Sequence, residues 1–348
     1  EKDGSSVITK HPDTGGLVSV GTVTAQLLYE VRDPRYLTPD VAARFDTIDI
    51  FQEDVHRVRI QGVKGEPPTS TTKVCINNLG GYRNSMTIIL TGLDIEKKAQ
   101  IVTEALFDSL GGEKLFSVVD VQLVRSEKKN PPTNEEAFAH LRLSVMDPDP
   151  KKVALFSSKL VELALASIPG FTATAPPTKG VPAIMHWPAL VSNNHIQQHV
   201  FVGDQEIVVK ALAQVEALHA TPPQARPLPS VPQGEIVSVP FGELFATRSG
   251  DKGGNANLGV WAKTPEAFAF LRDYLSVKRL KILLEDLADF EIERYELPNL
   301  LALNFYIKGL LGDGVAASLR SDPQAKTLGE YLRARIVEVP RSICPSDD

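Results

Sequence analysis

The sequence contains little cysteine and no long apolar run. Two cysteines occur in 348 residues. Cys75 and Cys344 lie far apart, and the second is in the C-terminal tail. This spacing excludes a disulfide framework and favours a reducing compartment, the cytoplasm or another intracellular one. No apolar run approaches the roughly 18 residues that a membrane helix needs, so we expect no membrane span.

An excess of positive charge is also missing. The chain has 37 Lys and Arg against 43 Asp and Glu, which gives a formal net charge of −6. No basic tract is interleaved with aromatic residues, and this argues against a nucleic-acid partner. The composition, 43% hydrophobic, is that of an ordinary globular protein, and the length suggests two or three domains.

The most informative stretch is residues 248–257, between apolar runs at 236–245 and 258–262. Its sequence, RSGDKGGNAN, holds two cations, a carboxylate, two carboxamides, a hydroxyl and three glycines, without a large apolar side chain. Glycine permits positive φ and the close approach of a backbone or ligand. Two interpretations stay open: a site for a polar, anionic small molecule, or a long β-hairpin turn whose charges pair with one another. Arg320 and Lys326 would face this stretch if the sheet brings both to one end.

A glycine-bearing loop at residues 11–16 is a second candidate site. It lies between a strand-like run at 7–9 and a helical spacing of apolar residues over 20–31. A strand, a glycine loop and a helix start together point free N–H groups at an anion. The loop has neither the G-x-G-x-x-G fingerprint nor the Gly-Lys-Ser/Thr of a P-loop. It is either ordinary turn chemistry or a ligand contact, and in the second case the contacting residues are His11, Thr14, Gly15 and Gly16.

Two further features carry polar side chains. Residues 77–84 predict another polar glycine loop, in which Arg83 either binds a carboxylate or phosphate in bidentate fashion or forms an internal ion pair. His195 and His199 have a spacing that suits zinc on a helix. No Glu lies between them and no third ligand follows nearby, so we expect strand-edge histidines and no metal site.

The pattern of elements predicts a mixed α/β and α+β fold. Residues 86–209 read as strand–helix–strand–strand–helix–strand, the split βαβ order of a ferredoxin-like sandwich. Residues 220–234 contain five prolines and predict a semi-rigid linker. Residues 235–348 then predict a second small α+β sandwich of β-α-β-β-α character. We therefore expect one domain at 1–219 and another at 235–348.

The first residues suggest a missing upstream part. The chain begins Glu-Lys-Asp-Gly, without Met and without an apolar signal region, and enters a strand-like run almost at once. We expect that an N-terminal portion of the same protein is cleaved or lies in another chain.

Several uncommon short sequence motifs are spread over nearly the whole chain. They are ITKHPDTGG (8–16), QLLYE (26–30), DPRYLTPD (33–40), NLGGYRNSM (78–86), RSGDKGGNAN (248–257), RYELPN (294–299), LNF (303–305) and residues 314–326. In these motifs the sequence resembles the acyclic terpene utilisation (AtuA-like) family. The resemblance implies a core that ends in a ferredoxin-like domain, with a larger N-terminal α/β part before the region where this chain begins. It also implies breakdown of citronellol- and geraniol-type terpenoids and branched acids through coenzyme A thioesters, but it assigns no catalytic roles.

The first functional hypothesis is an enzyme that acts on an acyl-CoA or related carboxylate, as a lyase or hydratase. Such a reaction needs a general acid or base and donors for a developing enolate oxygen. We expect Asp251 as the base, and the Thr14–Gly16 loop as a phosphate contact. Arg248 and Lys252 are catalytic candidates beside Asp251 and would hold the anion together with the amides around Gly253 and Gly254. Asn255 and Asn257 would orient polar substrate groups. No cofactor is identified, and the coenzyme A thioester enters only as part of the substrate.

Two alternatives belong to other classes. One is a non-catalytic binding or assembly subunit, in which the 248–257 stretch is an intermolecular contact of a homo-oligomer or a larger complex. The other is a hydrolase. Ser249 lacks a G-x-S-x-G setting, and Cys75 lies on a predicted strand without an obvious partner, so this alternative has little support.

Overall fold

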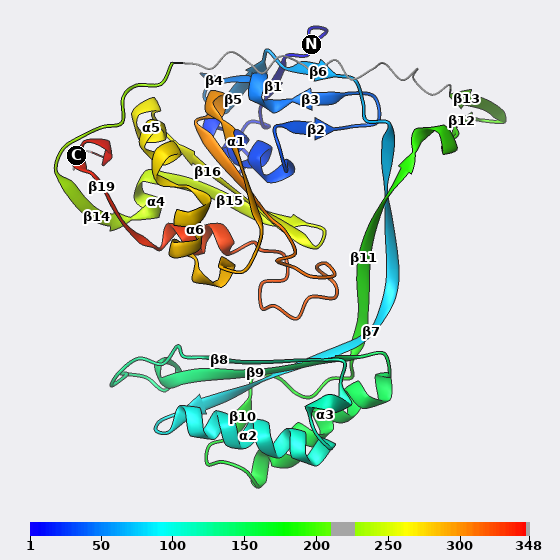
Figure 1. Cartoon of the computed structure of the whole chain (residues 1–348), viewed down its shortest axis with the longest axis vertical. Coiled ribbons are helices and arrows are strands. Elements are labelled where there is room, and N and C mark those ends of the chain that lie inside the picture. Colours follow the sequence, from blue (N-terminus) through cyan, green and yellow to red (C-terminus); the bar gives the residue numbers. More distant parts are fainter. Residues whose placement is uncertain (210–226, 346–348) are drawn as a thin grey trace. The chain divides into compact units, whose positions relative to one another are not determined.

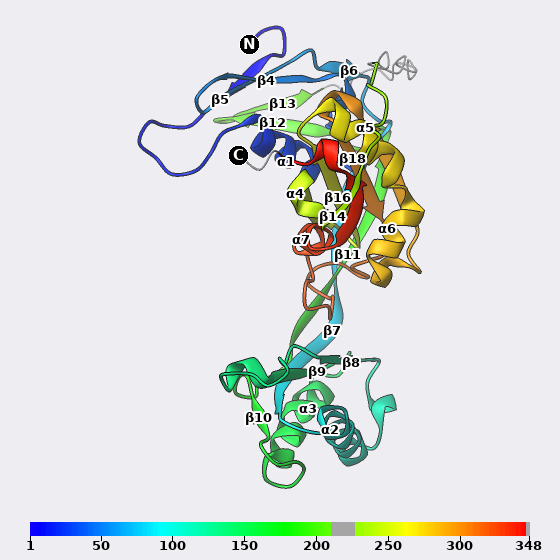
Figure 2. The same ribbon diagram turned by 90° about the vertical axis from the view of Figure 1, so that its left-hand side faces the viewer.

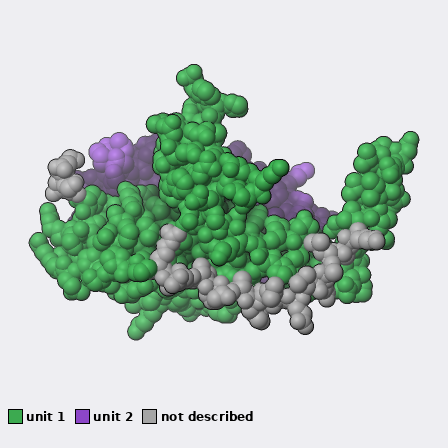
Figure 3. All heavy atoms as spheres, turned by 90° about the horizontal axis from the view of Figure 1, so that it is seen from above, with its two compact units in different colours: residues 1–76, 188–315, 322–348 green, residues 77–187, 316–321 purple. Residues whose placement is uncertain are grey.

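The computed structural model describes residues 1–209 and 227–345, so part of the predicted linker, 220–226, lies outside the described residues (Figure 1). The chain forms two compact units (Figure 3). Unit 1 consists of residues 1–76, 188–315 and 322–348, and unit 2 of residues 77–187 and 316–321. The units therefore differ from the domains that the sequence predicts, because the N-terminal 76 residues pack with the C-terminal sheet.

Unit 2 is built on an antiparallel sheet in the order β10-β7-β9-β8, with β11 also paired to β7. The elements are β7 (Thr71–Thr91), α2 (Ile95–Leu110), β8 (Val118–Val124), β9 (Phe138–Asp147), α3 (Pro150–Glu162), β10 (Thr172–Ala173) and β11 (Val181–Ser192). Read across the sheet, these strands are the fourth, first, third and second of the four in chain order, which is the ferredoxin-like order. A ferredoxin-like sandwich is thus present as expected, but it lies in residues 77–187, and residues 188–209 belong to unit 1.

Helices α2 and α3 cover one face of this sheet. Alternate residues of β7 and β9 are fully buried there, among them Ile88 and Leu141, and they pack with Leu106 of α2 and Phe156 of α3. Burying each such side chain contributes about 1.5–3 kcal/mol. Helix α2 ends as predicted, because Gly111 takes the left-handed conformation (φ 85°) and its N–H bonds back to the last turn.

The prediction of a polar glycine loop at 77–84 is wrong, because these residues lie inside the long strand β7. Its glycines are needed for close packing across the ribbon instead of for a turn. A Cβ at Gly80 would lie 2.2 Å from Met185 Sδ on β11. Gly81 has φ 128°, and a Cβ there would lie 2.8 Å from the carbonyl oxygen of Asp147.

The C-terminal part of unit 1 is a four-stranded antiparallel sheet in the order β15-β16-β18-β17. Its elements are β15 (Phe245–Lys252), β16 (Asn255–Ala262), α5 (Pro265–Tyr274), α6 (Val277–Leu283), β17 (Ile292–Leu297), β18 (Ala302–Ile307) and α7 (Leu328–Arg333). From β16 to α7 the chain has the predicted β-α-β-β-α order. The remaining strand of this sheet is β15, which precedes β16 in the chain. The last strand, β19 (Ile336–Pro340), pairs with β14 (Ile236–Pro240), and the short α4 (Phe241–Leu244) follows β14.

The remaining part of unit 1 consists of small sheets and one helix. Strands β1 (Ser6–Ile8), β4 (Asp49–Asp54) and β5 (Arg57–Gln61) form one sheet, and β2 (Arg35–Leu37), β3 (Ala42–Arg44) and β6 (Lys64–Glu66) form another. Strands β12 (Gln198–Val202) and β13 (Gln205–Val209) form a separate hairpin. Among the described residues, no helix has the length and apolar character needed to cross a bilayer.

The four-stranded sheet of unit 1 is covered on both faces. Helices α5, α6 and α7 pack on the face with the larger apolar cluster, and helix α1 (Val20–Glu30) packs on the other, where Leu28 joins a smaller apolar cluster with Leu297 and Ala302. Figure 2 shows α6 and α1 on opposite sides of the sheet. Two glycines allow this close approach. A Cβ at Gly259 would lie 2.7 Å from Leu28 Cβ, and a Cβ at Gly250 would lie 2.1 Å from a ring carbon of Tyr29. The C-terminal end of α1 therefore rests directly on β15 and β16.

Candidate functional site

The 248–257 stretch is a tight β-hairpin held on both sides. Lys252 of β15 pairs with Asn255 of β16, so only Gly253 and Gly254 form the turn, and Gly253 takes φ +68°. The carbonyl of Gly254 accepts from Leu311 N at 2.9 Å, and a Cβ there would lie 2.1 Å from the carbonyl oxygen of Gly312. The stretch is therefore a β-hairpin, but with a two-residue turn in place of the long turn expected, and its glycines serve the turn and the close contacts.

Three cations converge on the ring of Tyr29. The guanidinium carbon of Arg248 lies 4.9 Å from the ring centroid, and Nζ of Lys252 and of Lys326 lie 4.4 and 4.3 Å from it. Lys252 Nζ also donates to the Tyr29 carbonyl, and Lys326 Nζ to the Tyr29 hydroxyl. Cation–π contacts of this kind are worth about 0.5–2 kcal/mol each. We call these four residues the Tyr29 cluster.

The cluster carries more positive than negative charge. Lys326 forms an ion pair with Asp251 at 3.7 Å, as expected if the sheet brings both to one end. Burial lowers the pKa of Lys252, while the charges of Glu30 and Asp251 oppose this shift and those of Lys326 and Lys73 add to it. Bringing an anion among these cations would offset the cost of holding their charges together. The arrangement can therefore bind an anionic group and offers a lysine that releases its proton more readily than usual.

The two asparagines of the stretch have structural partners. Asn257 is fully buried, and its Nδ2 donates to the carbonyl of Leu28 at 2.7 Å. Asn304 on β18 likewise donates to the carbonyls of Val31 and Arg32. The carbonyls at the end of a helix have no partner within it, and these asparagines satisfy those of α1. Asn255 bonds the hydroxyl of Tyr306 at 2.7 Å. Neither asparagine of the predicted site is held toward the Tyr29 cluster by these bonds.

The 11–16 loop shows the chemistry of an ordinary turn. His11, Thr14, Gly15 and Gly16 are exposed, and Thr14 Oγ1 donates to the carbonyl of His11 at 2.7 Å. Helix α1 begins three residues after the loop with its own cap. Ser19 and Thr22 form a capping box, and Val20 N donates to Gln52 Oε1 at 3.2 Å. Because the first N–H groups of α1 are used in this way, the expected anion site at the helix start finds no support in the geometry.

Arg83 belongs to unit 2. Its Nη1 donates to the carbonyl of Ser318 at 2.6 Å, so its partner is a backbone carbonyl and neither of the two partners that the sequence left open. Its Nε is buried and has no hydrogen-bond partner among the described residues. Arg83 is thus available for more than the one bond it makes.

The remaining candidates do not form a second centre of chemistry. His199 Nδ1 lies 2.5 Å from Glu206 Oε1, its diagonal neighbour in the β12–β13 hairpin. In residues 1–209 and 227–345, no three His, Cys, Asp or Glu side chains come together as metal ligands would. Ser249 Oγ accepts from Gly329 N at 2.9 Å, and Cys75 lies exposed on β7. These settings do not activate a nucleophile.

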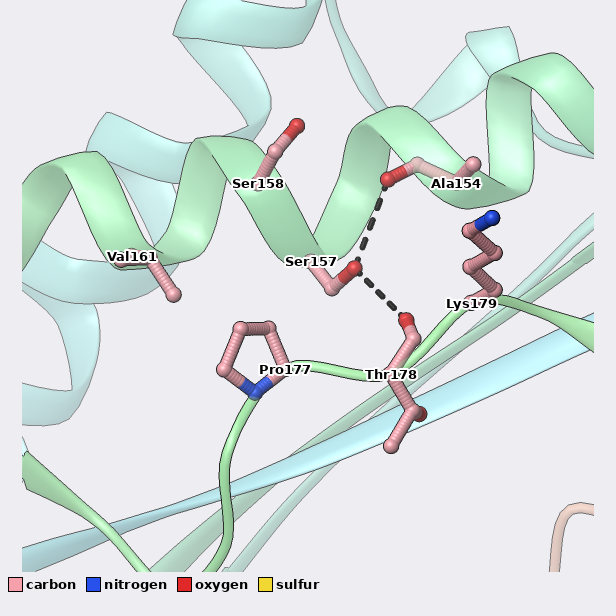
Figure 4. A pocket seen from close by; sticks show the side chains of 7 residues that line it. All are labelled: Ala154, Ser157, Ser158, Val161, Pro177, Thr178 and Lys179. Carbon is pink, nitrogen blue, oxygen red and sulfur yellow. Dashed lines mark hydrogen bonds between the residues drawn. The ribbon is translucent and has the colours of Figure 1, made fainter.

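A shallow pocket of about 320 Å³ lies between α3 and residues 177–179 of unit 2 (Figure 4). Ser157 Oγ donates to the carbonyl of Thr178 across its floor at 2.9 Å. Lys179 is the single ionisable side chain in its lining, which is otherwise made of Ala154, Ser157, Ser158, Val161, Pro177 and Thr178. The pocket brings no acid and base together.

The central member of the site was missed as a site residue by the sequence. Tyr29 stands in the motif QLLYE, which was noted only as uncommon. Tyr29 and Lys326 are 297 positions apart, so no local pattern shows that they meet.

Comparison with known proteins gives two family matches. The model of the acyclic terpene utilisation family protein AtuA matches residues 1–202, and that of the AtuA ferredoxin-like domain matches residues 239–338. The two ranges leave residues 203–238 between them, where the sequence predicts the linker. No curated protein and no solved structure matches the chain.

Proposed function

Because the chain belongs to the acyclic terpene utilisation family AtuA, we propose that it is an enzyme of acyclic terpenoid and branched-acid breakdown. Membership suggests a role in acyclic terpene utilisation. The finer part of the proposal is the reaction, a lyase or hydratase acting on an acyl-CoA or related carboxylate. The observation that supports it is the Tyr29 cluster, where three cations lie over one aromatic ring and one of them, Lys326, pairs with the carboxylate of Asp251.

The cluster contains the groups that such a reaction needs. In hydration, Asp251 takes a proton from water, the water oxygen bonds to the β carbon, and the double-bond electrons move toward the thioester oxygen. Arg248 and Lys252 hold the enolate that forms, because preorganised cations stabilise charge developing in the transition state. The α carbon of the enolate then takes up a proton, and Lys252 is suited to supply it since burial lowers its pKa. A lyase runs the same steps in reverse.

The test is turnover of a branched enoyl-CoA by Asp251→Asn. General acid–base catalysis contributes about 10²–10⁴-fold, so we expect a loss of that size in kcat with an unchanged fold by circular dichroism. Asp273→Asn is the matched control, since Asp273 pairs with Arg272 on the exposed side of α5. Equal turnover by wild type and Asp251→Asn would remove Asp251 from the mechanism.

A second candidate, a non-catalytic assembly subunit, is favoured by one observation. The β12–β13 hairpin exposes Val200, Phe201, Val202, Ile207 and Val208, although isolated two-stranded hairpins are only marginally stable in water. This hairpin would then be the contact of a homo-oligomer or a larger complex. In that case the native mass exceeds the mass of one chain. The wild type then turns over no branched acyl-CoA, whatever its oligomeric state.

A further inference from the structure

The ferredoxin-like sheet of unit 2 has a second face that is polar. The helices of unit 2, all of whose residues the structure describes, cover the other face (Figure 1). Residues of β7 and β9 alternate, so that Ile88 and Leu141 face the helices while Arg83, Ser85, Arg142 and Ser144 lie opposite. The strand register places Ser85 of β7 directly across from Ser144 of β9, with Arg142 two residues before Ser144.

Two arginines and two serines form a cradle on this face. Ser85 Oγ donates to Ser144 Oγ at 2.7 Å, and Ser144 is fully buried, so the two hydroxyls form a fixed floor. Arg83 and Arg142 come from the two strands on either side of this serine pair. Their guanidinium groups approach each other, because they donate to the backbone carbonyls of two successive residues. We call these four residues the arginine cradle.

The carbonyls belong to residues 316–321 of the same unit. Arg83 Nη1 donates to the carbonyl of Ser318 at 2.6 Å, and Arg142 Nη1 donates to that of Leu319 at 2.5 Å. Arg142 Nη1 also lies 3.3 Å from Ser321 Oγ. The acceptors are therefore neutral oxygens, each carrying only a partial negative charge.

The positive charge of the cradle is only partly neutralised. Asp120 is the nearest carboxylate, with its Oδ2 3.9 Å from Arg142 Nη1. Burial lowers the pKa of Arg142, and the charge of Arg83 acts in the same direction. Arg83 Nε is buried without a partner among the described residues. The unused N–H donors of the two guanidinium groups, together with the serine hydroxyls, are more numerous than the two oxygens of a carboxylate. They suit a phosphate group, which offers more oxygens.

We propose that the arginine cradle binds a phosphate group of a small molecule, and that the carbonyls of Ser318 and Leu319 occupy the place of its oxygens in the free chain. On binding, the two arginines exchange two neutral carbonyl acceptors for the charged oxygens of the phosphate. Residues 316–321 then leave this face of the sheet. This site lies in unit 2 and does not depend on the proposed reaction at the Tyr29 cluster.

The test is equilibrium binding of inorganic phosphate and pyrophosphate to the whole chain by calorimetry. We expect saturable binding that weakens at least tenfold in Arg83→Gln and in Arg142→Gln. Malonate, the carboxylate probe, should bind at least tenfold more weakly than pyrophosphate. Lys159→Gln is the control, because Lys159 pairs with Glu162 on α3 of the same unit and should leave binding unchanged. Urea unfolding midpoints show whether each variant is folded.

A second measurement on the wild type needs no variant. Hydrogen exchange of the peptide that covers residues 316–321 should become faster when pyrophosphate is added, because its carbonyls lose the two arginines. The proposal is overturned if phosphate does not bind, if it binds equally to Arg142→Gln, if malonate binds as well as pyrophosphate, or if exchange of this peptide does not change. Since no turnover is measured, failure here leaves the proposed enzyme activity untouched.

Discussion

At the scale of single residues, Lys252 is the most informative side chain of the Tyr29 cluster. It donates to the Tyr29 carbonyl, lies over the same ring and carries a lowered pKa because it is buried. A buried lysine with a lowered pKa is a common acid–base group in enzymes, and the sequence also offered Lys252 as a catalytic candidate that holds the anion. Its burial follows from helix α1, which no local pattern around position 252 reveals.

The lowered pKa of Lys252 predicts a specific pH dependence of stability. Above the folded pKa and below the ordinary value of 10.5, the unfolded chain keeps a proton that the folded chain has released. Stability therefore rises with pH through this window, and the contribution is absent from Lys252→Met. Urea unfolding of both proteins between neutral pH and 10.5 should show the wild type gaining on the variant as the pH rises. A difference that stays flat, or that runs the other way, would contradict this account of Lys252.

Other single residues show what the sequence could and could not predict. Gly111 stops α2 as predicted, because its role depends only on local conformation. Asn257 was expected to orient substrate but holds the end of α1, since its partner Leu28 lies more than 200 positions away. A polar residue in an uncommon motif indicates that its side chain has a specific role. The partner that defines this role is visible only in the three-dimensional structure.

At the scale of elements, the contact of α1 with β15 and β16 builds the candidate site. It places Tyr29 between Arg248 and Lys252 and sets the asparagine side chains against the helix end. The sequence predicted α1 and the strand of β16 from their apolar spacing. It did not predict that they touch, because neither glycine at the contact differs in pattern from a glycine in a turn. The same limitation explains residues 77–84, where paired glycines inside β7 look like a loop.

The α1 contact predicts opposite outcomes for two glycine substitutions. Gly259→Ala places a Cβ 2.7 Å from Leu28 Cβ and should destabilise the chain by about 1–3 kcal/mol, because the helix must shift. Gly15→Ala is the control, since a Cβ there meets nothing within 4 Å and should leave stability unchanged or slightly raised. Urea unfolding midpoints of the three proteins measure this. If Gly259→Ala is as stable as the wild type, α1 does not lie against β16 as described.

At the scale of the whole molecule, the order of the chain and the order of packing differ. The Pro-rich segment separates the two ranges that match the family models, but the first 76 residues pack with the C-terminal sheet. Bonds such as that from Asn299 Nδ2 to the carbonyl of Phe45, and the ion pair of Arg32 with Glu293, join these distant parts of unit 1. A change in composition marks a linker, but it does not show which segments pack together. This is why the ferredoxin-like order of unit 2 was predictable and the membership of unit 1 was not.

The central claim is that the Tyr29 cluster binds an anionic substrate, and equilibrium binding of a branched acyl-CoA and of its free acid tests it most directly. Wild type, Arg248→Gln and Lys326→Gln should be compared by calorimetry, with Arg333→Gln as a control, because Arg333 pairs with Glu330 on α7. We expect both ligands to bind the wild type and the control equally well, and each cluster variant to weaken binding about tenfold or more. Equal affinity in all four proteins, or no binding to the wild type, would contradict the account.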